Sequence, residues 1–257
     1  METLIIERTA SGVATVTLNR PQKKNAVNAA MWNDLLEIFR EVDARDEDRV
    51  LVITGAGGEF CSGADLGVEG ERDRHQLLRM HHLNNVALAL HRLTKPTIAK
   101  VRGVAAGAGL NLGLGCDLVV AGETARFSQI FARRGLAIDF GGSWILPRLV
   151  GLHKAKELAL FADIIDAREA ERMGLVNRVV ADGELDAFVA SWAERLAAGP
   201  PLALAMTKRL LNDGLGTDFA AALDAEAMAQ SVTIVTDDVR EAFSAFFEKR
   251  TPEFKGR

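Results

Sequence analysis

Tyrosine is absent from this chain of 257 residues. Short-chain dehydrogenases, which have a similar length, use a tyrosine as proton donor, so that class has no candidate for the role here. Cysteine occurs only at Cys61 and Cys116, too few for a disulfide framework, and no Cys-x-x-Cys pair or Cys/His cluster predicts a metal site. The net charge is −4, which does not favour a nucleic-acid partner.

Long apolar runs are missing as well. No stretch approaches about 18 uninterrupted apolar residues, so we expect no membrane-spanning helix. The N-terminal segment METLIIERTA carries charges among its apolar residues and lacks the basic head and apolar core of a signal peptide. We therefore expect a cytoplasmic protein that does not bind membranes.

Short apolar runs, glycine-rich loops and helical patterns alternate through the first two-thirds of the chain. Strands are expected at 4–9, 13–18, 50–54, 97–101 and 118–121. Helices are expected at 29–42 with Asn28 as the N-cap, at 71–93, and from the second glycine-rich loop to about Gly115. The glycine-rich loops are expected at 55–70 and 103–109. This alternation indicates an α/β fold with buried, partly parallel strands.

The pattern becomes helical after about Asp182. Helices are expected at 184–198, 202–211, 218–231 and 237–249, with the clearest break at Gly199-Pro200-Pro201. We predict a core with the active site at 1–198 and a helical region at 199–257. From the pattern alone, the helical region is either an oligomerisation element or one more packing layer on the same domain.

Each glycine-rich loop follows a predicted buried strand and offers backbone N–H groups to an anion. The second loop, Gly103 to Gly109, also leads into a helix N-terminus, whose partial positive charge favours an oxyanion. It lacks the Gly-Lys-Ser/Thr of a phosphate-binding loop, and Leu112 stands where a dinucleotide-binding fingerprint needs a third glycine. Tight packing is the alternative explanation of each loop taken alone.

Five separated motifs resemble, in order, those of the enoyl-CoA hydratase/isomerase (crotonase) superfamily. They are Asn19-Arg20-Pro21, Phe60-Cys61-Ser62-Gly63-Ala64-Asp65, Gly103-Val104-Ala105-Ala106-Gly107-Ala108-Gly109, Cys116-Asp117 and Gly174-Leu175-Val176-Asn177. The resemblance covers essentially the whole chain. It implies a spiral of ββα units followed by a C-terminal helical trimerisation region, in a homotrimer or a dimer of trimers.

The resemblance also implies a substrate and its site. Members bind acyl-CoA thioesters, with CoA as part of the substrate and no further cofactor or metal, and stabilise a thioester enolate with two backbone N–H groups. By the motif match these N–H groups belong to Ala64 and Ala108. Further substrate contacts are expected from Lys23, Lys24, Ala26, Ser62, Asp65, Leu66, Gly107, Asn111, Phe131 and Lys249. For Asp65, hydrogen bonding within a turn is an equal structural alternative.

Two of these positions separate the activities of the superfamily. Hydratases carry two glutamates that hold and activate a water, and the motif match places them at Asn111 and Phe131. An amide does not usefully accept a proton near neutral pH, and a phenyl ring cannot hold a catalytic water. The sequence therefore disfavours ordinary hydratase chemistry.

Asp139 supplies a different carboxylate, in the segment Gly135 to Trp144. Aspartate at this place resembles the branch of ring and double-bond isomerases that includes the phenylacetate-pathway 1,2-epoxyphenylacetyl-CoA isomerases. Its apolar neighbours are expected to raise its pKa, so that it can act as acid and base. An N-cap for the helix expected from Gly141-Gly142 is the structural alternative.

Several other activities stay open. One is a hydratase with an atypical acid/base set, and another is a non-catalytic acyl-CoA-binding protein. A third is an aromatic acyl-CoA dehalogenase, which would use the aspartate as nucleophile but is expected to have tryptophan in place of Phe131. The segment 68–83 is expected to line the acyl pocket, although the acyl group itself does not follow from the residues.

Overall fold

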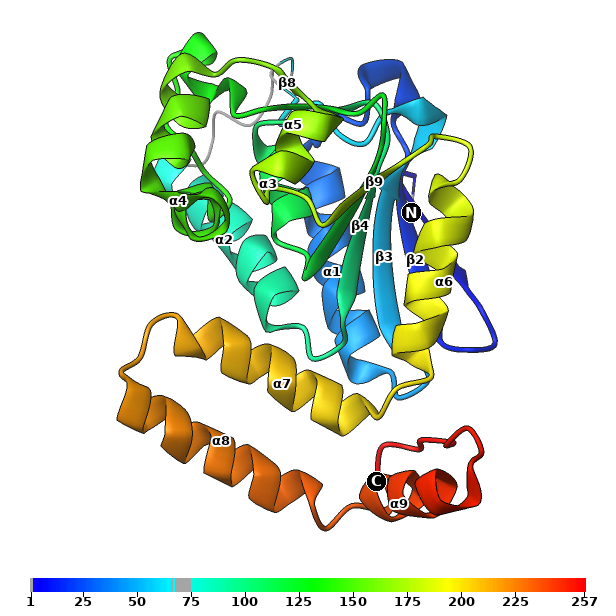
Figure 1. Ribbon diagram of the computed structural model, residues 1–257. Helices are drawn as coiled ribbons and strands as arrows, with labels where there is room; N and C mark the ends of the chain where they lie inside the picture. Colours follow the sequence, from blue (N-terminus) through cyan, green and yellow to red (C-terminus); the bar gives the residue numbers. More distant parts are fainter. Residues whose placement is uncertain (1, 66, 68–74) are drawn as a thin grey trace.

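The computed structural model describes residues 2–65, 67 and 75–257. A mixed α/β core carries a layer of helices at one end (Figure 1). The strands are β1 (Leu4–Arg8), β2 (Val13–Leu18), β3 (Val50–Gly55), β4 (Thr97–Val101), β5 (Val104–Ala106), β6 (Leu118–Gly122), β7 (Arg126–Ser128), β8 (Ile165–Asp166) and β9 (Arg178–Val180). In the described ranges no helix is long and apolar enough to cross a membrane.

The helices connect these strands and then extend beyond them. They are α1 (Ala29–Ala44), α2 (Gln76–Arg92), α3 (Ala108–Leu114), α4 (Gly142–Phe161), α5 (Ala167–Arg172), α6 (Leu185–Ala197), α7 (Pro201–Gly214), α8 (Phe219–Thr233) and α9 (Asp237–Glu248). Short 3-10 turns lie at η1 (Pro21–Lys23), η2 (Ala56–Gly58) and η3 (Ile130–Arg134). The predicted helix at 71–93 corresponds to α2, and its residues 71–74 lie outside the described residues.

The larger sheet has the strand order β1-β2-β3-β4-β6-β9 within the described part of the chain. Only the β1–β2 hairpin is antiparallel, and every other neighbouring pair in this sheet is parallel. Parallel strands need crossover connections, which α1, α2 and α3 supply. The expectation of buried, partly parallel strands is therefore confirmed.

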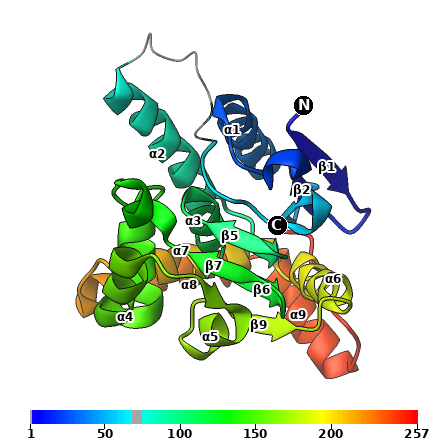
Figure 2. The same cartoon turned by 90° about the horizontal axis from the view of Figure 1, so that it is seen from above.

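Helices cover both faces of this sheet, as Figures 1 and 2 show. Leu51 and Ile53 of β3 belong to the apolar cluster that includes residues of α1, α2 and α3. Val50 and Val52, on the opposite face, pack with residues of α6. Burial on both faces explains the nearly continuous apolar run in β3, because alternating side chains both meet helices.

Helix α1 shows how local sequence sets an element. The side chain of Asn28 accepts a hydrogen bond from the N–H of Met31 at 3.0 Å, which caps the first turn. Buried apolar residues then recur at helical spacing on one face. The predicted N-cap at Asn28 is confirmed.

A second, smaller sheet has the order β5-β7-β8. Its first strand lies inside the segment 103–109 that the sequence predicts as a loop, so that prediction is wrong for Val104–Ala106. Small residues have little strand propensity of their own, and parallel pairing with β7 holds this segment extended. An isolated bridge between Cys61 and Ala105 places the first glycine-rich segment beside β5.

Helices α7, α8 and α9 lie below the core in Figure 1. Lys208 of α7 forms an ion pair of 2.8 Å with Asp117 and donates to the carbonyl of Lys95 at 3.0 Å. Arg49 donates to the carbonyl of Phe254 at 3.0 Å and joins the C-terminal tail to the core. The predicted assignment of 199–257 to oligomerisation stays a prediction.

Candidate active site

The two glycine-rich segments interlock at Cys61. The N–H of Cys61 donates to the carbonyl of Val104, and the N–H of Ala106 donates to the carbonyl of Cys61, both at 2.9 Å. A Cβ on Gly109 would lie 2.5 Å from Sγ of Cys61, so only glycine fits there. The loop after β3 and the start of α3 are therefore held in contact by backbone bonds and a close approach.

Gly63 makes a second close approach. Its φ of 106° suits glycine, and a Cβ there would lie 3.0 Å from the carbonyl oxygen of Ala106 and 3.9 Å from the nitrogen of Ala108. The residue after Gly63 is Ala64. The predicted pair, Ala64 and Ala108, thus belongs to two segments that touch.

Both alanine N–H groups remain free to bind a ligand. The bridge between Val27 and Ala64 uses the carbonyl of Gly63 and the N–H of Asp65, and leaves the N–H of Ala64 unused. Ala108 begins α3, where a helix offers no internal acceptor for the N–H. Among the hydrogen bonds of the described residues, none uses either of these donors.

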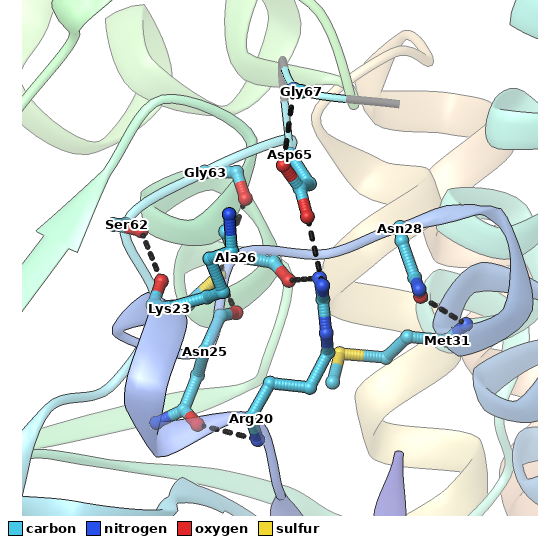
Figure 3. A network of polar contacts seen from close by, with 11 residues as sticks. Arg20, Lys23, Asn25, Ala26, Asn28, Met31, Ser62, Gly63, Asp65 and Gly67 are labelled. Atoms are coloured by element: carbon cyan, nitrogen blue, oxygen red, sulfur yellow. Dashed lines mark hydrogen bonds and ion pairs between the residues drawn. The ribbon is translucent and has the colours of Figure 1, made fainter. Parts of the chain in front are cut away.

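Residues 19–26 form a network of hydrogen bonds that supports the first glycine-rich segment (Figure 3). Arg20 donates to Asp65 Oδ2 at 2.8 Å and to the carbonyl of Ala26 at 2.5 Å. Asn25, fully buried, donates to the carbonyls of Ala56 and Glu59 at 2.9 and 2.7 Å. These bonds fix where Ala64 lies relative to the core.

Asp65 therefore has a structural partner. The hydrogen bond from Arg20 holds the pKa of Asp65 below its ordinary value, and its Oδ1 also accepts from the N–H of Gly67 at 3.1 Å. The sequence leaves a substrate contact and turn bonding as equal alternatives for Asp65. The structure places its carboxylate in this ion pair and turn, outside the cavity lining.

A cavity of about 300 Å³ opens beside the two free N–H groups. Its walls are mostly apolar or small, and they come from both glycine-rich segments, β7, η3 and the loop before α4. The lining residues are Ser62, Gly63, Ala64, Val104, Ala105, Ala106, Gly107, Ala108, Arg126, Phe127, Ser128, Ile130, Phe131, Arg134, Leu136, Asp139 and Ile164. Six of the predicted site residues share this cavity: Ser62, Ala64, Gly107, Ala108, Phe131 and Asp139.

Among the lining residues that the structure describes, Asp139 is the only carboxylate. Burial among apolar neighbours raises its pKa to about 6, and its Oδ1 is buried without a hydrogen-bond partner in the described part of the molecule. Helix α4 has Gly141 at its N-cap and no side-chain cap, so Asp139 does not serve that purpose. A carboxyl group with this pKa can take and return a proton near neutral pH.

Asn111 lies behind the cavity wall. Its side chain is fully buried, donates to the main-chain carbonyl of Asp139 at 2.8 Å, and accepts from Gln129 at 2.8 Å. Both polar atoms of the Asn111 side chain bind protein groups, and Asn111 is not among the lining residues, so this geometry does not favour the expected substrate contact. Phe131 closes one side of the cavity with an apolar ring.

The remaining predicted residues are dispersed. Lys23 and Lys24 lie on or next to η1, and Lys24 pairs with Glu59 at 2.9 Å. The carbonyl of Ala26 accepts from Arg20, and Lys249 follows α9 and is not among the lining residues of the cavity. Leu66 lies outside the described residues, as do 68–74 of the expected acyl-pocket segment.

Sequence reasoning missed Arg126, Gln129, Arg134 and Ile164. Arg126 and Arg134 bring positive charge to the cavity, and Ile164 closes it from the segment after α4. Gln129 does not line the cavity but is buried against Asn111. The only sequence signal for Gln129 was its place next to β7, because its partner lies on another element.

Comparisons with known proteins show the family of the chain. The family model "Enoyl-CoA hydratase/isomerase" matches residues 8–257. A protein called probable enoyl-CoA hydratase from Rhodobacter capsulatus is 42% identical over 251 residues, covering 96% of each chain. The 1,2-epoxyphenylacetyl-CoA isomerase of Escherichia coli is 36% identical over 271 residues, covering 100% of each.

The fold agrees with a solved structure as well. The crystal structure of an enoyl-CoA hydratase from Bacillus anthracis superposes with a TM-score of 0.95 at 32% identity, covering 99% of this chain and 100% of that one. The chain belongs to the enoyl-CoA hydratase/isomerase family, and its fold is the crotonase fold. The resemblance given by the five motifs is confirmed.

Proposed function

We propose that this protein is an acyl-CoA isomerase that moves a double bond in an enoyl-CoA thioester. The observation that supports this is the single carboxyl group of Asp139 in a cavity that also holds the free N–H groups of Ala64 and Ala108. One carboxyl group and two backbone donors suffice for a proton shift. Adding water across a double bond calls for groups that hold the water as well.

The reaction begins when ionised Asp139 removes a proton from an activated carbon of the bound thioester. The electron pair moves onto the thioester oxygen, and the N–H groups of Ala64 and Ala108 stabilise the resulting enolate or dienolate. Protonated Asp139 then returns the same proton to another carbon, and the double bond shifts. With a ring epoxide as the acyl group, the same carboxyl group would assist ring rearrangement.

The reaction takes up and releases no net proton. Every proton that leaves the substrate returns to it, so the reaction needs no water, redox cofactor or metal. The raised pKa of Asp139, about 6, lets the carboxylate act as a base near neutral pH and still hold a proton for the return step. CoA enters only as part of the substrate.

Hydration is the second candidate function. The relatives from Rhodobacter capsulatus and Bacillus anthracis both carry hydratase names, whereas the Escherichia coli relative is called an isomerase. A hydratase built on this site would rely on Asp139 alone to activate water beside the apolar ring of Phe131. A third candidate is a protein that binds acyl-CoA thioesters without turning them over.

Product mass separates these functions. The purified protein is incubated with a panel of aliphatic and aromatic enoyl-CoA esters, and the products are identified by mass spectrometry and ultraviolet absorption. We expect unchanged mass with altered absorption. A gain of one water would establish hydration instead, and thioester binding without turnover of any ester would establish a silent binder.

We further propose that the helical region at 199–257 packs against other copies of the chain, as a homotrimer or a dimer of trimers. Helices α7 and α8 bury no residue within the described chain, and Phe219 and Met228 of α8 are 79% and 72% exposed. Exposed apolar surface of this kind favours association. Light scattering after gel filtration tests it, and a monomeric mass would contradict it.

Contacts with the CoA part are proposed for Lys23 and for Lys249, the latter from a neighbouring copy. Lys249 is the C-cap of α9, and α9 contributes no residue to the described lining of the cavity in its own chain. Both are exposed cations suited to phosphate groups. Replacing either by methionine should raise the KM for the CoA ester more than that for a truncated pantetheine thioester.

A further inference from the structure

Asn111 is buried between two elements that meet at the active site. Its Nδ2 donates to the main-chain carbonyl of Asp139 at 2.8 Å, and its Oδ1 accepts from Nε2 of Gln129 at 2.8 Å. Asn111 and Gln129 are 0% and 1% exposed. Neither lines the cavity, so neither can touch a substrate there.

The direction of these two bonds is fixed by chemistry. The carbonyl of Asp139 can only accept, so Asn111 must present its amide nitrogen to it. The oxygen of Asn111 then faces the amide nitrogen of Gln129, whose own Oε1 stays without a partner among the described residues. A glutamate in place of Asn111 would set carboxylate oxygens against a carbonyl oxygen. Gly142 packs close to this side chain, because a Cβ on Gly142 would lie only 2.4 Å from Nδ2 of Asn111.

The main chain of Asn111 is bound to the oxyanion side of the site. Its N–H donates to the carbonyl of Gly107 at 3.0 Å and closes the first turn of α3, which begins at Ala108. The N–H of Gly107 donates in turn to the carbonyl of Ser128 at 2.9 Å, next to Gln129. One residue thus links the segment that carries the Ala108 donor to the segment that carries the Asp139 carboxyl.

The other contacts of the Asp139 segment hold its main chain and the Phe140 ring and do not orient Oδ1 of Asp139. Phe140 has a φ of 49° and Gly141 a φ of 77°, and the N–H of Gly142 makes the other bond to the Asp139 carbonyl, at 2.9 Å. The carboxyl Oδ1 has no hydrogen bond to orient it. The Phe140 ring stacks on Trp32 with centroids 5.1 Å apart, which restrains the next residue but not the carboxyl group.

We propose that Asn111 is a positioning residue that fixes the place of the Asp139 carboxyl group relative to the N–H of Ala108. Gln129 keeps the amide of Asn111 in the orientation that this requires. The inference rests on the proposed function, in which Asp139 moves the proton. It explains why an amide stands at a position where a carboxylate would serve a hydratase. The amide binds the protein rather than the substrate.

The charged groups near Asp139 influence its pKa. Arg126 of β7 and Arg134 of η3 line the same cavity. From α3 and α1, the residues that meet this segment are Asn111 and Trp32, which are uncharged. Asp139 is the one carboxylate among the described lining residues, so a carboxylate introduced at position 111 would add a negative charge beside it and would disfavour its ionisation.

Two substitutions of Asn111 test the proposal with an enoyl-CoA ester that the wild-type protein isomerises. Asn111→Ala removes the bond, and we expect kcat to fall about 10²-fold with far less change in KM. Asn111→Asp removes the donor and adds a charge, so the acid limb of the kcat–pH curve should also move to higher pH. Asn85→Asp on α2, where Asn85 is exposed, is the matched control and should behave as wild type.

Gln129→Ala gives an independent test, and it keeps the proposal falsifiable should the Asn111 variants fold poorly. We expect a smaller fall in kcat in the same direction, with the thermal unfolding midpoint measured for every variant. Wild-type kcat in the Asn111 and Gln129 variants would overturn the proposal. A fall in kcat together with a raised KM and a lower thermal unfolding midpoint, with the acid limb of the kcat–pH curve unmoved, would also overturn the proposal. Asn111 and Gln129 would then have a structural role only.

The failure of the proposed function would look different. If Asp139→Asn keeps wild-type turnover, Asp139 does not move the proton, whatever the Asn111 variants do. If Asp139→Asn abolishes isomerisation and the Asn111 and Gln129 variants turn over as wild type, the positioning role alone is wrong.

Discussion

The two sides of the cavity hold their reactive groups in different ways. The donor wall, residues 61–65 and 104–109, presents backbone N–H groups in segments tied together at Cys61, Gly63 and Gly109. The carboxyl wall, residues 139–142, is held through main-chain carbonyls and the Phe140 ring, whereas Oδ1 of Asp139 has no hydrogen-bond partner among the described residues. The reactive groups of the donor wall are thus fixed by the backbone itself, whereas the reactive group of the carboxyl wall is a side chain that is oriented only indirectly.

This difference predicts where substitutions act. Backbone donors on the donor wall survive most side-chain changes, so their loss requires a change of the backbone itself. The carboxyl wall has one group that one substitution removes. Changes to the carboxyl wall should therefore alter catalysis without altering stability much, and changes behind the donor wall should alter stability first.

Asp139→Asn should have the largest effect on turnover. The variant keeps the shape of the carboxyl wall but cannot accept the proton, so we expect kcat for isomerisation to fall by about 10³-fold. Steady-state kinetics with an isomerised enoyl-CoA ester measure this. Asp224→Asn on α8, where Asp224 is exposed, is the control. Turnover near wild type in Asp139→Asn would remove Asp139 from the mechanism.

Ala108→Pro attacks the donor wall through its backbone. Ala108 is the first residue of α3, where proline costs a helix little because that N–H has no internal acceptor. Losing one oxyanion donor should lower kcat by about 10²-fold to 10³-fold. Ala29→Pro makes the same change at the first residue of α1. Equal activity in the two variants would contradict the assigned donor.

Arg20→Met tests the brace behind the donor wall. The side chains of Arg20 and Asp65 are 16% and 10% exposed, so removing the guanidinium leaves a largely buried carboxylate unpaired. We expect the free energy of unfolding to fall by about 2–3 kcal/mol. Arg209→Met breaks an exposed pair with Asp213 and should cost less than about 1 kcal/mol. Denaturant titration compares them, and similar losses would show that the brace adds nothing special.

The sequence predicts the donor wall better than the carboxyl wall. Small residues after buried strands, in family order, indicate Ala64 and Ala108 because a backbone site leaves its mark as short side chains. The hydrogen bonds of Asn111 join residues 18 and 28 positions apart, on separate elements. No local pattern encodes such a bond, so Asn111 was expected to touch substrate.

The same reasoning explains two other differences. Strand β5 was missed because its Val-Ala-Ala sequence has a weak local preference, and pairing with β7 decides its conformation. Asp65 could be placed at the first segment but not on Arg20, which lies 45 residues earlier. In both cases the deciding contact is long-range, whereas the predicted cap of α1 is local and is confirmed.

The smallest predicted effect concerns the pH dependence of stability at the carboxyl wall. The pKa of Asp139 is raised from 3.8 to about 6 in the folded protein by burial, so the folded state binds its proton more tightly than the unfolded chain does. The stability that this proton confers is complete below pH 3.8 and is lost as the pH rises through about 6. Asp139→Asn should lack this dependence.

The unfolding free energies of wild type and Asp139→Asn should therefore diverge with rising pH. Between about pH 4 and about pH 7 we expect the wild type to lose about 1 kcal/mol relative to the variant, less than the full shift implies because solvent reaches part of the carboxyl group. Denaturant titrations at several pH values give this difference. The free-energy cost of the asparagine amide does not depend on pH, so it drops out when differences at two pH values are compared. A constant difference across that window would show that Asp139 is solvated in the folded protein, and the donor wall would then be the only pre-organised side of the cavity.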